Sequence, residues 1–369
     1  MAIMATDATI NWNQQLTAIE ELEDAGLDAG FVAECERHAS RVTSREIRFS
    51  TPTFKSYSNC DVSGCGKNSF PAFSITAGAC GLNCDHCQAK ILEPMIAATS
   101  PAMLDSKVRE MVVREDLQGF LLSGGSNRRN EVPYARYLPV VEGLKRDFPH
   151  LRIAIHTALL DAARANDIAS AGVDTAMMDV IGARETIAGV YHLDRSVDDF
   201  EATLAALCAT PMEVVPHIVI GLHYGRILGE PTALDIVSRH AIHSLVLVVV
   251  MPFYAKPGTF VTPDTHDVGR IFLQARERIP DRQVLLGCAR PPGMHRRATD
   301  AYAVIAGLDG IAFPADGALA AAHTIGRPAV QEHACCSVKT GNTIKLHPRT
   351  TARAAINSQP AAQPIVFAR

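Results

Sequence analysis

Residues 70–87 read Phe70-Pro-Ala-Phe-Ser-Ile-Thr-Ala-Gly-Ala-Cys80-Gly-Leu-Asn-Cys84-Asp-His-Cys87, an apolar run followed directly by three cysteines. The run from Phe70 to Thr76 is short and rich in β-forming residues, which predicts a strand. The cysteines follow in the next loop with the spacing C-x₃-C-x₂-C. In α/β folds the loops at the carboxyl ends of the strands carry the chemistry, so we expect a functional site here.

Further β-rich runs follow along the chain, separated by amphipathic stretches of roughly 10 to 15 residues. The run Leu245–Met251 is apolar without alternation, which indicates a strand covered on both faces. Helix starts are predicted at Ser100, an N-cap residue before a proline, and at Ser196. The predicted strands are Phe70–Thr76, Gly119–Ser123, Leu151–His156, Asp174–Val180, Glu213–Gly221, Ser244–Met251, Gln283–Gly287 and Gly310–Phe313.

This alternation of strands and helices predicts an α/β fold, a (β/α)₈-like barrel that is closed or nearly closed. An open doubly wound sheet has the same periodicity and remains an alternative. Residues 1–50 are predicted to be a charged helical N-terminal extension, and residues 51–340 to be the barrel with its cysteine-containing flanks. Residues 341–369, rich in Ala, Pro, Gln and Thr, are predicted to be a flexible C-terminal tail.

Composition narrows the class of protein. Of the 369 residues, 47% are hydrophobic, which excludes a disordered chain, and no apolar run approaches the ~20 residues of a membrane helix. The net charge of −4 is spread without a basic excess, so we expect no nucleic-acid partner and no membrane. The N-terminus lacks the form of a signal peptide, so we expect a cytoplasmic protein that binds a small molecule or another protein.

The ten cysteines are many for a cytoplasmic chain, where thiols stay reduced, and such a surplus indicates metal. Cys80, Cys84 and Cys87 suit a [4Fe–4S] cluster, in which three protein ligands leave the fourth iron open. A structural zinc site, with His86 or a distant residue as fourth ligand, is the main alternative. The solitary Cys35 and Cys208 lie in helix-like sequence and are expected to be small buried hydrophobic residues.

The cysteine motif resembles the cluster loop of the radical S-adenosylmethionine superfamily, with His86 before its last cysteine. The resemblance covers roughly residues 70–340. It implies a radical S-adenosylmethionine barrel and a [4Fe–4S] cluster whose open iron binds S-adenosylmethionine. One electron, from a donor such as ferredoxin or flavodoxin, would split this cofactor and generate a 5′-deoxyadenosyl radical that abstracts hydrogen from the substrate.

Further residues follow the predicted strands at the same rim. The Gly-Gly turn at 124–125 is similar to the family's segment that holds the methionine amino group, although Ser126 replaces its acidic residue. Asp179 is placed to accept hydrogen bonds from ribose hydroxyls, and Gly221 lies in a segment that resembles the adenine-contact motif. The plainer interpretations are a turn for the glycines, a helix N-cap for Asp179 and structural roles for the histidines. The predicted cofactor-binding residues are Ser123, Gly124, Gly125, His156, Asp179, His217 and Gly221, and the predicted catalytic residues are Asp179 and His217.

A second set of thiols comes back to this rim. Cys288 ends the seventh predicted strand, and the adjacent Cys335 and Cys336 follow the eighth βα unit. We expect these three to be ligands of a second, auxiliary iron–sulfur cluster, with Cys60 and Cys65 as further candidates. Alternatively, the adjacent pair forms a disulfide or binds adventitious metal.

Taken together, these motifs resemble the biotin-synthase-like branch, near the two-protein (split) lipoyl synthases. This implies sulfur insertion into an unactivated C–H bond of an octanoyl chain carried on a protein lysine, with sulfide from the auxiliary cluster. It also implies an acyl-lysyl carrier protein as substrate and a second radical S-adenosylmethionine subunit as partner. The alternatives are a radical mutase or C–C lyase, a methylase in cofactor biosynthesis, and a zinc-binding scaffold protein.

Overall fold

The computed structural model describes residues 11–39, 45–52, 57, 59, 61, 62, 64 and 69–347. Within these residues twelve strands form one sheet, in the order β12-β11-β1-β10-β9-β8-β7-β6-β5-β4-β2-β3. Neighbouring strands are parallel except β11 and β12, which are antiparallel. The strands are β1 (Ile47–Ser50), β2 (Ala72–Ser74), β3 (Ile96–Ala97), β4 (Gly119–Ser123), β5 (Arg152–His156), β6 (Thr175–Asp179), β7 (Glu213–Ile220), β8 (Ser244–Val249), β9 (Gln283–Leu286), β10 (Gly310–Ala312), β11 (Ala329–Glu332) and β12 (Thr343–Leu346).

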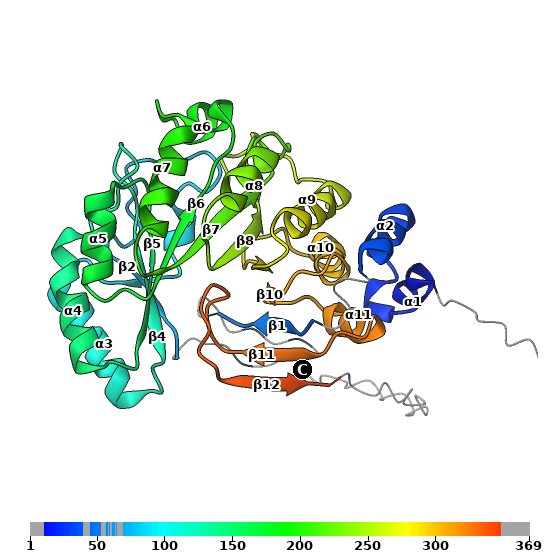
Figure 1. The fold of residues 1–369 in the computed structure, drawn as a ribbon, viewed down its shortest axis with the longest axis horizontal. Helices are drawn as coiled ribbons and strands as arrows, with labels where there is room; N and C mark the ends of the chain where they lie inside the picture. Colours follow the sequence, from blue (N-terminus) through cyan, green and yellow to red (C-terminus); the bar gives the residue numbers. More distant parts are fainter. Residues whose placement is uncertain are drawn as a thin grey trace, which may run out of the picture.

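Helices alternate with the central strands and cover the outside of the sheet (Figure 1). The α-helices are α1 (Trp12–Thr17), α2 (Ala29–Ala39), α3 (Pro101–Arg114), α4 (Leu138–Asp147), α5 (Ala162–Ser170), α6 (Arg184–Val190), α7 (Val197–Cys208), α8 (Glu230–Ser238), α9 (Thr265–Arg278), α10 (Met294–Ile305) and α11 (Ala318–Thr324). Short 3₁₀ helices lie at Glu20–Leu22, Lys90–Leu92 and Ala135–Tyr137. The mostly parallel α/β architecture confirms the predicted fold class. Among the described residues, no pairing closes the sheet between β3 and β12.

All eight predicted strands are present, within a few residues of their expected ends. Both predicted helix starts are confirmed: Ser100 accepts a hydrogen bond from the Met103 backbone N–H, and Ser196 forms a capping box with Asp199. Four further strands were not predicted. Of these, β1 lies inside the predicted helical extension and pairs with β10 and β11, while β12 lies inside the predicted tail. The sheet therefore takes in both flanks of the predicted barrel, and residues 348–369 lie outside the described residues.

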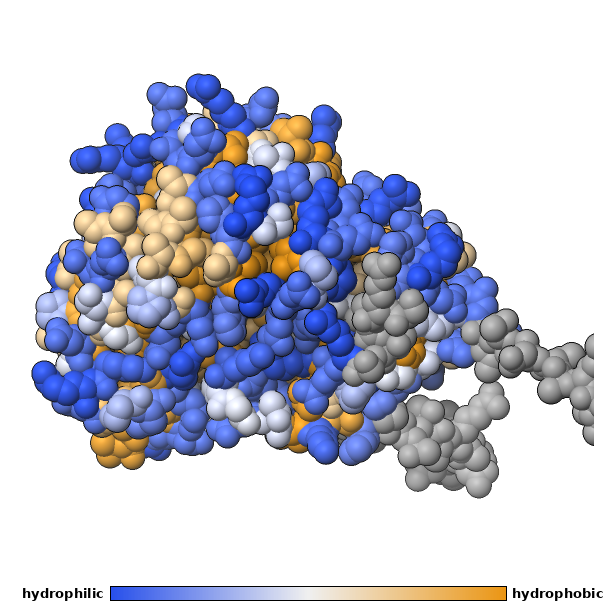
Figure 2. Space-filling view, in the orientation of Figure 1, coloured by the Kyte–Doolittle hydropathy of each residue, from blue (hydrophilic) through white to orange (hydrophobic). Residues whose placement is uncertain are grey.

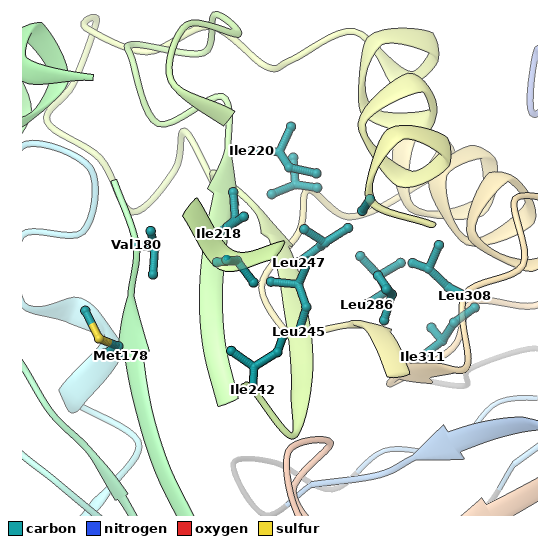
Figure 3. Close-up of a cluster of buried hydrophobic side chains, with 14 of the residues drawn as sticks. Met178, Val180, Ile218, Ile220, Ile242, Leu245, Leu247, Leu286, Leu308 and Ile311 are labelled. Atoms are coloured by element: carbon teal, nitrogen blue, oxygen red, sulfur yellow. The ribbon is translucent and has the colours of Figure 1, made fainter. Parts of the chain in front are cut away.

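Two apolar layers explain why the central strands are apolar without alternation. Successive side chains of a strand face opposite sides, so each strand contributes to both layers. The outer layer packs between the sheet and the helices and includes Met178, Ile218 and Leu247 (Figure 3). The inner layer is smaller and includes Met177 and Val246, the neighbours of outer residues on the same strands. Strands buried on both faces in this way are typical of parallel sheets.

The N-terminal extension packs against the helices that follow the last strands. Its α1 and α2 lie beside α11 and α10 (Figure 1). The ring of Phe31 contacts the ring of Tyr302 edge-on, with centroids 5.0 Å apart, and the Asp28 backbone N–H donates to the Tyr302 hydroxyl over 2.6 Å. The helical prediction is therefore correct for residues 12–17 and 29–39, and wrong for β1.

The face of the molecule shown in Figure 2 is mainly polar, as expected where helices cover the apolar core. Figure 2 shows a mainly hydrophilic face on which apolar side chains form limited areas. No helix in the described part of the chain combines the length and the apolar character needed to cross a membrane.

Candidate active site

A cavity of about 300 Å³ lies at the carboxyl ends of the strands, where the sequence predicted the site. Its apolar wall comes from the inner layer, with Leu121, Met177 and Val246 among the contributors. Every predicted site residue but three is on its surface. Those on the surface are Cys80, Cys84, Cys87, Ser123, Gly124, Gly125, His156, Asp179, His217, Cys288, Cys335 and Cys336.

The loop of the first three cysteines is held from one side by the turn after β4. The Gly125 backbone N–H donates to the Thr76 hydroxyl over 2.7 Å, and the Gly81 N–H donates to the Ser126 carbonyl over 2.8 Å. A Cβ on Gly125 would lie 2.0 Å from the Ala79 carbonyl oxygen. Since only glycine permits this approach, the Gly-Gly turn has a demonstrable role in shaping the cysteine loop.

From the other side the loop is held through Asp85, which lies between two of the cysteines and is buried. Its backbone N–H donates to the Val190 carbonyl over 2.9 Å, and its carbonyl accepts from the Lys256 N–H over 2.8 Å. Its carboxylate lies 3.1 Å from His192 Nε2. The end of α6 with the residues that follow it, and the loop after β8, thus hold the cysteine loop at the rim of the cavity.

The surroundings of Cys84 and Cys87 disfavour negative charge on their thiols. Burial raises the pKa of Cys84, and the neighbouring Cys87 and Cys80 raise it further. Burial also raises the pKa of Cys87 to about 11. Because metal ligands must be thiolates, a bound cation would supply the missing countercharge. The donor set therefore fits an iron–sulfur cluster with three cysteine ligands.

A second group of metal-ligating side chains lies in the cavity, apart from the cysteine loop. Among the described residues, one group of three metal-ligating side chains has its ligand atoms all within 4.8 Å, and the cysteine loop is not that group.

The group that meets this criterion consists of His156, Asp179 and His217, on three adjacent strands. His156 Nε2 lies 3.8 Å from Asp179 Oδ1, and the two imidazole rings stack with centroids 5.2 Å apart. Burial, with His156 as a second cause, lowers the pKa of His217 to about 3. His217 is therefore a neutral imidazole at the floor of the cavity.

Two aromatic residues complete this part of the cavity. His86 stacks on Tyr191 with ring centroids 5.0 Å apart, and the Tyr191 hydroxyl donates to Asp179 Oδ2 over 3.4 Å. Burial lowers the pKa of His86 to about 4. Tyr191 was not predicted, because it lies in a loop after α6 and belongs to no periodic pattern or motif.

The second set of thiols faces the same cavity from the last strands. Cys335 and Cys336 are free thiols, so the predicted alternative of a disulfide between them is wrong. A hydrogen bond from Cys336 lowers the pKa of Cys335 and raises that of Cys336. The buried Arg48 guanidinium donates to the Cys336 carbonyl over 2.7 Å and to Glu332 over 3.0 Å. Arg48 was missed in the sequence because it lies in the unpredicted strand β1.

Three predicted site residues are not on the cavity surface as described. Gly221 has a φ of +77°, and its N–H donates to the buried Glu230 carboxylate over 2.7 Å. A Cβ there would lie 2.3 Å from the Pro263 ring, so Gly221 shapes a turn and does not line the cavity. Cys60 and Cys65 lie outside the described residues.

Comparison with known structures identifies the fold. No protein-family model matches the chain, and no curated protein sequence is similar to it at a significant level. A crystal structure of HydG, a maturase of the [FeFe]-hydrogenase, has a TM-score of 0.53 and 11% identity, covering 82% of this chain and 64% of that chain. HydG from Carboxydothermus hydrogenoformans has a TM-score of 0.50 and 17% identity, covering 76% of this chain and 62% of that one.

The chain thus spans less than two thirds of the length of either HydG chain. The chain and the two HydG structures share their fold, a mostly parallel α/β sheet covered by helices. At this level of sequence identity the comparison identifies the fold and leaves the reaction to be inferred from the site.

Proposed function

We propose that the protein is a radical S-adenosylmethionine enzyme. The observation that carries this proposal is that Cys80, Cys84 and Cys87, from one loop, line the cavity at the carboxyl ends of the strands. These cysteines would hold a [4Fe–4S] cluster with one open iron. When bound, the cluster and S-adenosylmethionine supply a 5′-deoxyadenosyl radical that removes a hydrogen atom from an unactivated carbon.

The protein itself supplies position and a dry environment. Ser123, Gly124 and Gly125 lie beside the cysteine loop and would contact the methionine part of the cofactor. Asp179 would accept hydrogen bonds from the ribose hydroxyls, with His156 and His217 beside it. We assign Asp179 and His217 as catalytic residues because both line this cavity and lie next to one another.

We further propose that the reaction is sulfur insertion of the lipoyl-synthase type. The specific observation is that Cys288, Cys335 and Cys336 face the same cavity as the first cysteine loop. They would hold an auxiliary cluster, a source of sulfide close to the carbon from which hydrogen is removed. The apolar inner wall suits an aliphatic chain such as the octanoyl group of an acyl-lysyl carrier protein.

The physiological setting follows from this reaction. The enzyme would need a low-potential electron donor, such as ferredoxin or flavodoxin, and a second radical S-adenosylmethionine subunit for the other sulfur. A cytoplasmic location would keep the many thiols reduced. A radical mutase or C–C lyase, or a methylase, would share the first cluster but have no use for the second set of thiols.

Anaerobic reconstitution followed by assay tests this proposal in two steps. Two [4Fe–4S] clusters correspond to about eight irons per chain, and replacing Cys335 and Cys336 with alanine should leave about four. Incubation with S-adenosylmethionine, a reductant and an octanoyl-lysyl peptide should yield 5′-deoxyadenosine and a peptide that gains sulfur in the mass spectrum. One bound zinc ion per chain, without iron, would refute the proposal that the protein is a radical S-adenosylmethionine enzyme. Formation of 5′-deoxyadenosine together with transfer of label from the methyl group of S-adenosylmethionine to the product would show methylation instead of sulfur insertion.

A further inference from the structure

Three ligating side chains from adjacent strands converge at the floor of the cavity. The parallel register places Asp179 of β6 opposite His217 of β7, and His156 of β5 opposite Met177, two residues before Asp179. All three face the inner side of the sheet, because each is separated from an inner-layer residue by two positions. Their ligand atoms therefore lie within 4.8 Å of one another.

Two imidazoles and one carboxylate are a recurrent donor set for divalent first-row metal ions, notably Fe²⁺, and leave open coordination positions. His217 is only 9% exposed, and its Nδ1 is buried without a hydrogen-bond partner in the described structure. A buried polar nitrogen without a partner costs free energy, and a ligand would remove that cost. Asp179 Oδ2 is already oriented by Tyr191, which leaves Oδ1 facing His156.

The charge of the cavity favours a cation at this position. Its described lining contains one carboxylate, that of Asp179, and no lysine or arginine. No permanent positive charge of the lining therefore compensates this carboxylate, and a divalent ion would do so.

We propose that His156, Asp179 and His217 form a mononuclear site for a divalent first-row transition-metal ion, distinct from both cysteine sites. The proposal stands on the geometry of the three side chains and does not depend on radical chemistry. Because the same residues are assigned above to the nucleoside part of S-adenosylmethionine, the metal ion and the cofactor should exclude one another. The ion would therefore occupy the enzyme in the absence of the cofactor.

Titration of the cluster-loaded, oxidised enzyme with Mn²⁺ tests this site. Mn²⁺ prefers oxygen and nitrogen ligands to thiolates, and free Mn²⁺ is measured by its electron paramagnetic resonance signal. We expect one Mn²⁺ to bind per chain, and His156→Gln and Asp179→Asn each to weaken binding at least tenfold. The matched control is His223→Gln, whose imidazole lies against Thr186 and outside the cavity lining. Iron content and circular dichroism report whether each variant is folded.

Failure to bind Mn²⁺ in the folded wild-type enzyme would overturn the proposal, as would equal binding by wild type and both variants. Addition of S-adenosylmethionine should release the bound Mn²⁺. Binding of Mn²⁺ that S-adenosylmethionine does not displace would support the metal site and contradict the assignment of these residues to the cofactor. Normal formation of 5′-deoxyadenosine without Mn²⁺ binding would support the proposed function and contradict the metal site. The two proposals can therefore fail separately.

Discussion

At the scale of single residues, position 125 of the site has room for glycine and for no larger residue. A Cβ there would lie 2.0 Å from the Ala79 carbonyl oxygen and 2.7 Å from the Cys80 Cα. We predict that Gly125→Ala displaces the cysteine loop, destabilises the protein by about 1–3 kcal/mol through overpacking, and lowers iron binding. Iron analysis and urea unfolding of the purified variant measure both effects.

Gly78, in the same loop, is the matched control. A Cβ at Gly78 meets no atom within 4 Å, so Gly78→Ala should keep its iron and its stability. Equal iron content in the two variants would contradict the close contact between the Gly-Gly turn and the cysteine loop.

His217 gives the stability of the protein a defined dependence on pH. Burial lowers its pKa to about 3, whereas an imidazole in the unfolded chain has a pKa of about 6.5. Between these values the unfolded chain takes up a proton that the folded protein does not. This contribution to stability is therefore present above pH 6.5 and is lost as the pH falls towards 3.

We predict that His217→Gln lowers the slope of the free energy of unfolding against pH in this range, by an amount that corresponds to about one proton. Urea unfolding of the metal-free protein at several pH values measures that slope. Replacing the exposed His150 with glutamine is the control and should leave the slope unchanged. A His217→Gln slope equal to that of the wild type would show that the imidazole is charged in the folded protein.

At the scale of elements, the buried pair Arg290 and Asp300 holds the strand end that carries Cys288. Both side chains are almost completely buried, and the guanidinium donates to the carboxylate over 2.6 and 2.9 Å. Arg290 also donates to the Gly287 carbonyl, one residue before Cys288, over 2.8 Å. This ion pair therefore joins the end of β9 to helix α10.

We predict that Asp300→Ala destabilises the protein by about 3–5 kcal/mol, because it leaves a buried guanidinium without its counterion. Thermal or urea unfolding measures the loss. The exposed pair Glu110 and Arg114 on α3 provides the comparison, and Glu110→Gln should change stability little. Similar effects of the two substitutions would contradict the structural importance of the buried pair.

The same scale shows which elements the sequence could predict. The central strands are predictable because they are buried on both faces and lie between clear helix signals such as Ser100 and Ser196. Strands β1 and β11 were missed because they contain buried charged residues, Arg48 and Glu332, and β12 was missed because its side chains are mostly exposed. Those charges are accommodated by pairing with each other, which depends on contacts between distant parts of the chain.

At the scale of the whole molecule, the parallel sheet turns residues scattered through the sequence into one cavity. The cysteine loop, the strand-end carboxylate Asp179 and the adjacent Cys335 and Cys336 could be predicted, because each follows a recognisable strand or forms a local motif. The partners Tyr191 and Arg48 could not, since only the three-dimensional arrangement brings them to the cavity residues. Local patterns thus predict residues that line the cavity, and tertiary packing determines which residues contact them.

The cluster of Cys80, Cys84 and Cys87, with one iron open to S-adenosylmethionine, is the central claim. Its most direct test is electron paramagnetic resonance of the anaerobically reconstituted, reduced double variant Cys335→Ala/Cys336→Ala, with and without S-adenosylmethionine. The account predicts a [4Fe–4S]⁺ signal that changes when S-adenosylmethionine is added and that disappears when Cys84 is also replaced with serine. A signal that S-adenosylmethionine leaves unchanged, or that survives the loss of Cys84, would contradict it.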